Sequence, residues 1–493
     1  MATRTKSDLL GTTHGIDPIT FEILRHRLWA INDESATALR LVSGSPVANE
    51  AFDMNTALMN AAGDDFVIGT FIAIHALSMN IMAKDVLTEY SENPGINPGD
   101  TFLCNDPYVG CQHQMDAIVL SPIHYKDELV AWTGATVHNI DLDGPNEGQV
   151  QLDAESIFGE QPILPPIKVV EGGVLRKDLE RAWTRRSRLP ELVALDFRAK
   201  LAANNVARQR LIELIDEYGL GTITTMMDAI IDHTEARFRG RLRELPDGVW
   251  RHRSYIDYKE DLYRIVLTMT KKDETLHLDF RGTDKQAPAV INCTWAGLRS
   301  AFMASILAYL CFDMPWCPAG VMRAIEVESE PGTVIHSEFP AGVCKATTTA
   351  SWSATNVTAA CLGKMLAASD KWRDHAMALW QGTQPIEDVF GYDQRGRYFG
   401  ATILDCMAGG TGARSNKDGI NTGGFIVSMS GAIANVEAYE FRYPMLYLYR
   451  KHMPDTAGPG RFRGGVGASM MYVCHDVDWI PTKIMHTYGV EVP

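Results

Sequence analysis

The sequence predicts an α+β fold in several lobes, with helices toward the N-terminus and mostly antiparallel sheets in the C-terminal half. Long helical patterns occupy residues 18–41, 189–218 and 222–245, and three alternating runs follow between residues 248 and 281. The chain has 493 residues, whereas single hydrophobic cores stop growing at about 250–300 residues. We therefore expect an N-terminal α/β lobe, 1–246, and a strand-rich, glycine-rich C-terminal lobe, 247–493.

The first helix has clear start and stop signals. Asp17 can cap it, Pro18 suits its first turn, and apolar residues recur at helical spacing to about residue 41, before Ser-Gly-Ser-Pro at 43–46. Two short strands, 56–60 and 66–68, are expected next, around a turn. A helix at 72–86 then carries His75, which is either a core-facing residue or a site residue.

The remaining elements follow from the same patterns. A Pro/Gly-rich turn leads into a buried strand at 101–104, and the polar segment 144–166 has the composition of a long structured loop, either a lid or a subunit contact. Gly219 ends the helix at 189–218. After the alternating runs we expect helices at 292–313 and 350–368, and a strand at 322–329.

A polar stretch, residues 105–144, contains the strongest candidates for chemistry. His113 and Asp116 lie three residues apart beyond a turn-rich segment, and His138 follows an apolar, strand-like run. Two imidazoles and one carboxylate at strand ends suit a divalent ion that keeps open positions for substrate. We predict that these three residues bind a metal ion, although an H-x-x-D pair also arises by chance in chains of this length.

The neighbours of these residues have simpler interpretations. His124 has no partner in the pattern, so a surface or strand-end position is expected. Asp141 and Asp143 either shape a turn before Gly144 or support the metal ligands from outside. Cys111 is either a buried spectator or a further ligand.

The charge of the chain excludes some partners. The net charge is −15, from 46 Lys+Arg against 61 Asp+Glu, whereas nucleic acids and anionic membranes require a basic face. A local basic segment lies at residues 176–188. No apolar run of about 18 residues is present, which predicts no membrane span.

The cysteines indicate a reducing compartment. There are nine, an odd number, scattered and without a C-x-x-C pair, so neither a disulfide framework nor a zinc ribbon is expected. The N-terminal segment has no apolar signal region. We therefore expect reduced thiols in a cytoplasmic protein.

Two glycine-rich loops, 409–414 and 458–465, could bind an anion through their backbone amides and through Arg461 or Arg463. Neither has the G-x-x-x-x-G-K-[ST] arrangement of a phosphate loop. Tight turns between strands are the favoured interpretation, so a nucleotide would have its main site elsewhere.

Six segments occur in a recognisable order: DPITFE at 17–22, NDPY at 105–108, H-x-x-D at 113–116, RQRLIELIDEYG at 208–219, GGTGARSNKDG at 409–419 and DTAGPGRFRGGVG at 455–467. Together they resemble the hydantoinase B family over nearly the whole chain. Three longer segments, 165–199, 403–419 and 441–452, look closest to its ketone carboxylase branch, acetone and acetophenone carboxylase.

The resemblance implies a large subunit of an ATP-dependent hetero-oligomeric enzyme that carboxylates a small ketone with bicarbonate. ATP would bind to a hydantoinase A-like partner, with a small additional subunit. His113, Asp116 and His138 would hold a divalent metal (Mn, Zn or Fe). His75, Asp106 and Tyr108 are the candidate catalytic residues, for orientation or proton transfer.

Departures from the family pattern keep two alternatives open. Many members have a second glycine where this chain has Cys111, and a Gly-Gly pair in place of Asp143-Gly144. The chain could instead open a cyclic amide, such as a hydantoin, oxoproline or lactam, or be a metal-free scaffold subunit. It also stops at Pro493, before the family's usual glycine-rich ending, so the chain could be either complete or a C-terminally truncated fragment.

Overall fold

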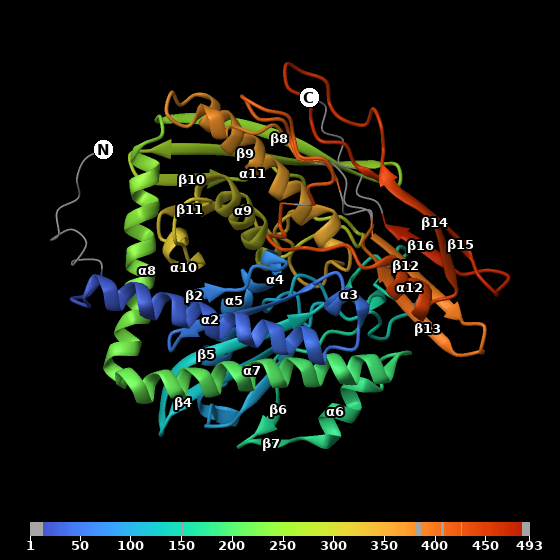
Figure 1. Ribbon diagram of the computed structural model, residues 1–493, viewed down its shortest axis with the longest axis horizontal. Helices are drawn as coiled ribbons and strands as arrows, with labels where there is room; N and C mark the ends of the chain where they lie inside the picture. The colour runs from blue at the N-terminus through green and yellow to red at the C-terminus, as the bar shows by residue number, and fades with distance from the viewer. Residues whose placement is uncertain (1–12, 150, 381–385, 406–408, 425, 486–493) are drawn as a thin grey trace.

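A computed structural model describes residues 13–149, 151–380, 386–405, 409–424 and 426–485 (Figure 1). Its largest sheet has seven strands in the order β2-β1-β5-β4-β3-β6-β7, and every neighbouring pair is antiparallel. The strands are β1 (Met54–Asn60), β2 (Asp65–Ile68), β3 (Thr101–Cys104), β4 (Ile118–Tyr125), β5 (Glu128–Val137), β6 (Ile167–Glu171) and β7 (Val174–Leu175). The α+β class is confirmed, and antiparallel pairing extends into the N-terminal half.

Long helices cover one face of this sheet. They are α2 (Pro18–Val42), α7 (Pro190–Tyr218) and α8 (Leu220–Arg243), with the shorter α6 (Lys177–Thr184) before α7. In Figure 1, α2 and α7 run side by side, and α8 stands across their ends. Asp17 caps α2 by accepting the Thr20 N–H at 2.8 Å, and Gly219, with φ +86°, separates α7 from α8. The predicted signals at these helix ends are confirmed.

The predicted helix 72–86 is divided in two, α4 (Ala73–Ala76) and α5 (Met79–Glu89). Ser78 lies at the division. Its hydroxyl donates to the Gly110 carbonyl at 2.6 Å and accepts from Gln112 Nε2 at 2.7 Å. The helix is therefore interrupted where a side chain holds the loop that carries His113.

The predicted meander forms most of a second sheet, in the order β11-β10-β9-β8. Its strands are β8 (Gly248–Tyr258), β9 (Asp261–Lys272), β10 (Thr275–Asp279) and β11 (Ile325–Glu328), and only β11 pairs in parallel. The predicted helices are α9 (Trp295–Leu310) and α11 (Ala350–Ala367), with α10 (Pro318–Met322) between them. α11 packs between α9 and this sheet, so nearly all its residues are buried.

The last third of the chain forms two small sheets beside α12 (Val436–Arg442), at the right of Figure 1. One has the order β13-β12-β16 and the other pairs β14 with β15. The strands are β12 (Ile386–Tyr392), β13 (Tyr398–Ile403), β14 (Met445–His452), β15 (Ala468–Cys474) and β16 (Thr482–Met485). Short helical turns complete the chain, namely α3 (Pro46–Asn49), Ser91–Gly95, Ile157–Gly159, Ala346–Thr348 and Arg373–His375.

One hydrophobic core joins the two predicted lobes. It contains Met59 and Trp132 of the first sheet together with Phe302 of α9 and Trp352 of α11. The lobe boundary near residue 246 stays a prediction, and the chain end at Pro493 lies outside the described residues. Within the described ranges, no helix has both the length and the apolar character needed to cross a membrane.

The two glycine-rich loops pack against each other. Gly465 N–H donates to the Thr411 carbonyl at 2.9 Å, and Gly419 N–H donates to the Arg463 carbonyl at 2.8 Å. A Cβ on Gly410 would lie 1.9 Å from the Gly465 carbonyl oxygen. These amides are hydrogen-bonded to carbonyls and the two backbones are in close contact. The arrangement therefore favours the interpretation as tight turns rather than as an anion-binding site.

Candidate metal centre

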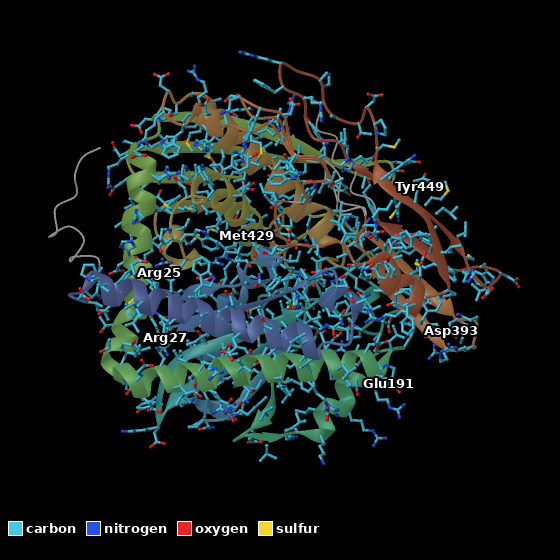
Figure 2. The ribbon with its side chains drawn as sticks, in the orientation of Figure 1. Arg25, Arg27, Glu191, Asp393, Met429 and Tyr449 are labelled. Atoms are coloured by element: carbon cyan, nitrogen blue, oxygen red, sulfur yellow. The ribbon has the colours of Figure 1, made fainter. Side chains whose placement is uncertain are left out.

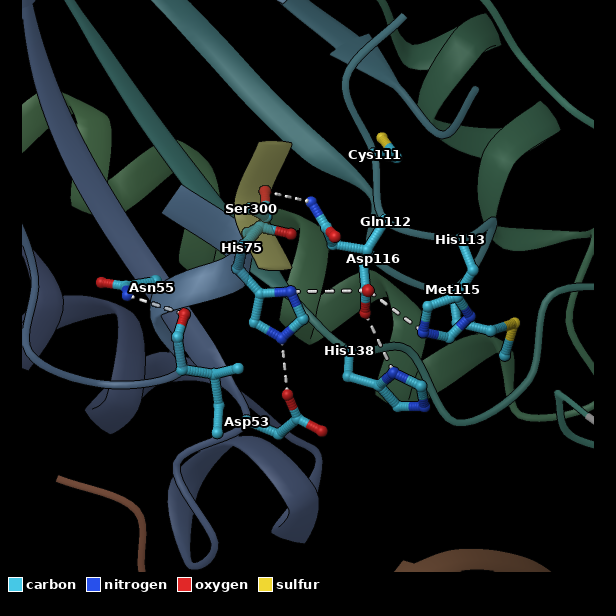
Figure 3. Close-up of polar contacts among 12 residues, drawn as sticks. Asp53, Asn55, His75, Cys111, Gln112, His113, Met115, Asp116, His138 and Ser300 are labelled. Atoms are coloured by element: carbon cyan, nitrogen blue, oxygen red, sulfur yellow. Dashed lines mark hydrogen bonds and ion pairs between the residues drawn. The ribbon is translucent and has the colours of Figure 1, made fainter. Parts of the chain in front are cut away.

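The three predicted metal ligands meet in the interior (Figure 3). His113 Nε2 lies 3.0 Å from Asp116 Oδ2, and His138 Nδ1 lies 3.0 Å from Asp116 Oδ1. All three side chains are buried, and their candidate ligand atoms lie within 4.8 Å of one another. The structure thus brings together residues from two separate loops.

The register of the first sheet explains this meeting. Ile118 at the start of β4 pairs with Thr136 near the end of β5, and Val137 pairs with Met54 at the start of β1. Asp116 precedes β4 by two residues, and His138 directly follows β5. Antiparallel pairing therefore places both side chains at one edge of the sheet.

Backbone hydrogen bonds hold the two loops together. Asn139 donates to the Met115 carbonyl from its backbone N–H at 2.9 Å and from its side-chain amide at 2.8 Å. The Asp116 N–H donates to the His113 carbonyl at 3.1 Å, closing a tight turn in the H-x-x-D pair. These bonds orient the ligand side chains before any ion binds.

His75 and Asp53 extend the cluster. His75 Nδ1 lies 3.4 Å from Asp116 Oδ2, and its Nε2 lies 2.6 Å from Asp53 Oδ1. Asp53 immediately precedes β1, at the same sheet edge, and its carbonyl accepts the His138 N–H at 3.1 Å. Sequence reasoning named His75 but missed Asp53, because no local pattern marks a lone aspartate before a strand.

The ionisation of the cluster follows from these contacts. Burial opposes the charge on Asp116, but His113 and His75 beside it hold the pKa of its carboxyl well below the ordinary value. Burial likewise disfavours the imidazolium of His138, yet its hydrogen bond to Asp116 and nearby carboxylates raise its pKa to about 9. The pKa of His75 is also raised, against burial, by Asp116 and Asp53.

The donor set fits a divalent cation. Buried polar atoms normally have hydrogen-bond partners, yet His113 Nδ1 and His138 Nε2 have none. Imidazole nitrogens and a carboxylate oxygen are donors that Mn, Fe and Zn accept. A cation bound by these residues would supply the positive charge that the buried Asp116 carboxylate otherwise draws from protonated imidazoles.

Asp106 and Tyr108 shape the loop before the H-x-x-D pair. Asp106 Oδ1 accepts the Tyr108 N–H at 2.9 Å, and the Tyr108 hydroxyl donates to the Ala341 carbonyl at 2.9 Å. The Tyr108 ring packs edge-on against Phe339. These two side-chain hydrogen bonds are with backbone groups outside the ligand set, so the catalytic roles of Asp106 and Tyr108 stay predictions.

The other singled-out residues have structural partners. The buried Asp141 carboxylate accepts from the Arg188 side chain at 2.8 Å and from its N–H at 2.6 Å, which anchors the segment before α7. Asp143 is exposed at φ +63° and accepts the Gly144 N–H, as a turn residue does. Cys111 is buried, and burial raises the pKa of its thiol well above the ordinary value. His124 is half-buried on β4.

The C-terminal half also contributes to this site. Asp388 of β12 is buried, and its charge helps raise the pKa of His138. The carboxylate accepts from Thr402 Oγ1 at 2.8 Å, and a Cβ on Gly148 would lie 2.8 Å from its Oδ2. No signal near residue 388 connects it to residue 138, so sequence reasoning could not find it.

The predicted loop 144–166 is described except for residue 150, and part of it lies beside the loop that carries His113. Its Glu160 is buried and accepts from Gln114 Nε2 at 2.6 Å, and from the N–H groups of Val343 and Cys344 at 3.0 and 2.9 Å. Glu160 thus connects the loop of His113 to the C-terminal half. A lid or subunit role for the segment stays a prediction.

Known proteins are similar to this chain in sequence and in fold. The acetophenone carboxylase delta subunit of Aromatoleum aromaticum is 28% identical over 94% of this chain and 68% of its own length. The caprolactamase beta subunit of Pseudomonas jessenii is 27% identical over 92% of this chain and 78% of its own length. A nucleotide-free acetone carboxylase structure superimposes with a TM-score of 0.88 and 22% identity, over 96% of this chain.

This chain spans 64% of that acetone carboxylase chain. The family model of hydantoinase B/oxoprolinase matches residues 17–488, nearly all of the sequence. The chain therefore belongs to the hydantoinase B/oxoprolinase family.

Proposed function

We propose that the chain is the metal-binding subunit of an ATP-dependent enzyme that carboxylates a small ketone with bicarbonate. The observation that carries this proposal is the buried set of two imidazoles and one carboxylate, in a chain similar to the acetophenone carboxylase delta subunit. Carboxylation at an alpha carbon develops negative charge on the ketone oxygen. A buried positive centre is suited to stabilising that charge.

His113, Asp116 and His138 would hold a divalent ion, Mn, Zn or Fe. When bound, the ion supplies positive charge beside an enolate or carbonate oxygen. The chain's own residues prepare this site. The sheet register aligns Asp116 with His138, and burial removes competing water.

His75 would position Asp116 and move a proton in the reaction, with Asp53 setting its orientation. The support is the pair of contacts on opposite ring nitrogens, 2.6 Å to Asp53 and 3.4 Å to Asp116. Carboxylate partners of this kind hold an imidazole in one tautomer and orientation. Asp106 and Tyr108 would act by positioning the turn that leads to His113.

ATP would be used by the complex and bound on a hydantoinase A-like partner subunit, with a small additional subunit completing the assembly. The sequence has no G-x-x-x-x-G-K-[ST] motif. The two similar proteins are themselves named as subunits, delta and beta. A partner would therefore deliver the activated bicarbonate to this chain.

ATP-dependent opening of a cyclic amide is the second candidate. The similarity to the caprolactamase beta subunit is nearly as high as to the carboxylase subunit, 27% against 28%. Both reactions place negative charge on a carbonyl oxygen, so the same residues would serve either. The metal-free scaffold is the less favoured alternative, because it leaves the buried donor atoms without partners.

One set of assays separates these possibilities. The chain is purified with its native partners, and ATP turnover is measured with labelled bicarbonate plus acetophenone, and separately with caprolactam. Label in an acid-stable product supports carboxylation, whereas bicarbonate-independent ring opening would replace it with the second candidate. Metal content of the parent, His138→Ala and the matched control His124→Ala is measured in the same preparations. Equal metal content in all three would refute the ligand assignment.

A further inference from the structure

A cavity of about 210 Å³ lies between the N-terminal half and residues 422–424 and 428–433. This volume is far above the roughly 15 Å³ that one water molecule needs, and below the roughly 300 Å³ at which sites for drug-sized ligands begin. Its size therefore suits a small organic molecule. Met429, labelled in Figure 2, belongs to its wall.

Among the residues that the structure describes, the wall carries no charged side chain. It is lined by Ala51, Ile72, Leu404, Thr422, Gly423, Gly424, Ser428, Met429, Gly431, Ala432 and Ile433. The polar groups of these described wall residues are peptide units and the hydroxyls of Thr422 and Ser428, and His452 Nε2 lies 3.3 Å from the Thr422 hydroxyl. A phosphorylated or carboxylate ligand would lack a cationic partner here. The wall instead matches a neutral molecule with an apolar body and a carbonyl group.

The cavity adjoins the segments that carry Asp53 and His75. Ala51 and Ile72 contribute to its wall, two and three residues away from these side chains. The opposite wall is joined to the same segments by the backbone. Ala73 N–H donates to the Val427 carbonyl at 2.7 Å, Met429 N–H donates to the Phe71 carbonyl at 3.3 Å, and Ala432 N–H donates to the Ala51 carbonyl at 3.4 Å.

We propose that this cavity binds the uncharged organic substrate, a small ketone or lactam, next to the Asp53–His75 pair. The identity of the ligand rests on the proposed function, but the binding site itself does not require a metal. The anionic co-substrate would then have to approach from another side, since the cavity offers it no cation.

The test is ligand-observed NMR on the purified full chain, with acetophenone and caprolactam as neutral probes and benzoate as the charged analogue. Ala432→Leu and Ile433→Phe fill the cavity from two positions. Ser430→Leu adds comparable bulk to an exposed position in the same loop, outside the wall. We expect a neutral probe to bind the parent and Ser430→Leu with equal affinity. Both filling variants should bind the probe at least about tenfold more weakly, because the added carbons occupy the ligand's space.

Three outcomes would overturn the proposal: no binding of either neutral probe at millimolar concentration, equal binding of benzoate, or unchanged binding in folded filling variants. Circular dichroism melting confirms which variants are folded. Metal content is measured on the same samples. If a His138→Ala variant loses its metal but still binds the probe, the cavity is supported independently of the metal. If the parent chain itself holds no metal but binds the probe, only the proposed metal function is refuted.

Discussion

Replacing Asp116 by asparagine is the sharpest perturbation of the candidate metal centre. The amide has nearly the same shape but no charge, and Asp116 lies 3.0 Å from each of two imidazole nitrogens. Removing one partner of a buried charged pair costs about 3–5 kcal/mol. At about 1.4 kcal/mol per tenfold change, Asp116→Asn should weaken metal binding by roughly 100-fold to a few thousand-fold.

The measurement is competition for the metal against a chelator of known affinity, followed by elemental analysis. The control is His124→Ala, which removes a half-buried imidazole from strand β4. This control should bind metal as the parent does. If Asp116→Asn changes the affinity less than about tenfold while the protein stays folded, the electrostatic reasoning given for this centre is wrong.

Three further predictions concern the Asp53–His75 pair, Glu160 and the paired glycine-rich loops. Asp53→Asn and His75→Gln should each lower metal affinity by about 10–100-fold. A double variant that binds metal much more weakly than either single variant would show that the two residues do not act as one pair. Burial raises the pKa of Glu160 from 4.5 to about 6, so its ionisation lowers stability as pH rises through this window. Glu160→Gln should abolish a fall of roughly 2 kcal/mol in the free energy of unfolding between pH 4.5 and 6.5. Urea unfolding at both pH values measures this fall. An equal fall in the parent and the variant would contradict the prediction. Gly410→Ala should destabilise the paired loops by at least about 1 kcal/mol, seen as a lower Tm, because its Cβ would overlap the Gly465 carbonyl; an unchanged Tm would count against the close packing.

Much of the local structure was predictable. The cap at Asp17, the stop at Gly219 and the meander after residue 248 all depend on residues adjacent in sequence or one helical turn apart, and each is found as expected. The break at Ser78 was not predicted, because it depends on hydrogen bonds to Gly110 and Gln112, which are distant in sequence.

By itself, the sequence determined most of the elements and the pairing of His113 with Asp116, since three residues of chain cannot separate them far. His138 could be named only by assuming that its strand end lies near theirs. The tertiary structure decided that assumption, because the register of β1, β4 and β5 sets which strand ends share an edge. It alone brought Asp53 and Asp388 to the site, since their interactions with His138, 85 and 250 residues away, depend on sheet pairing and core packing, which periodicity does not encode.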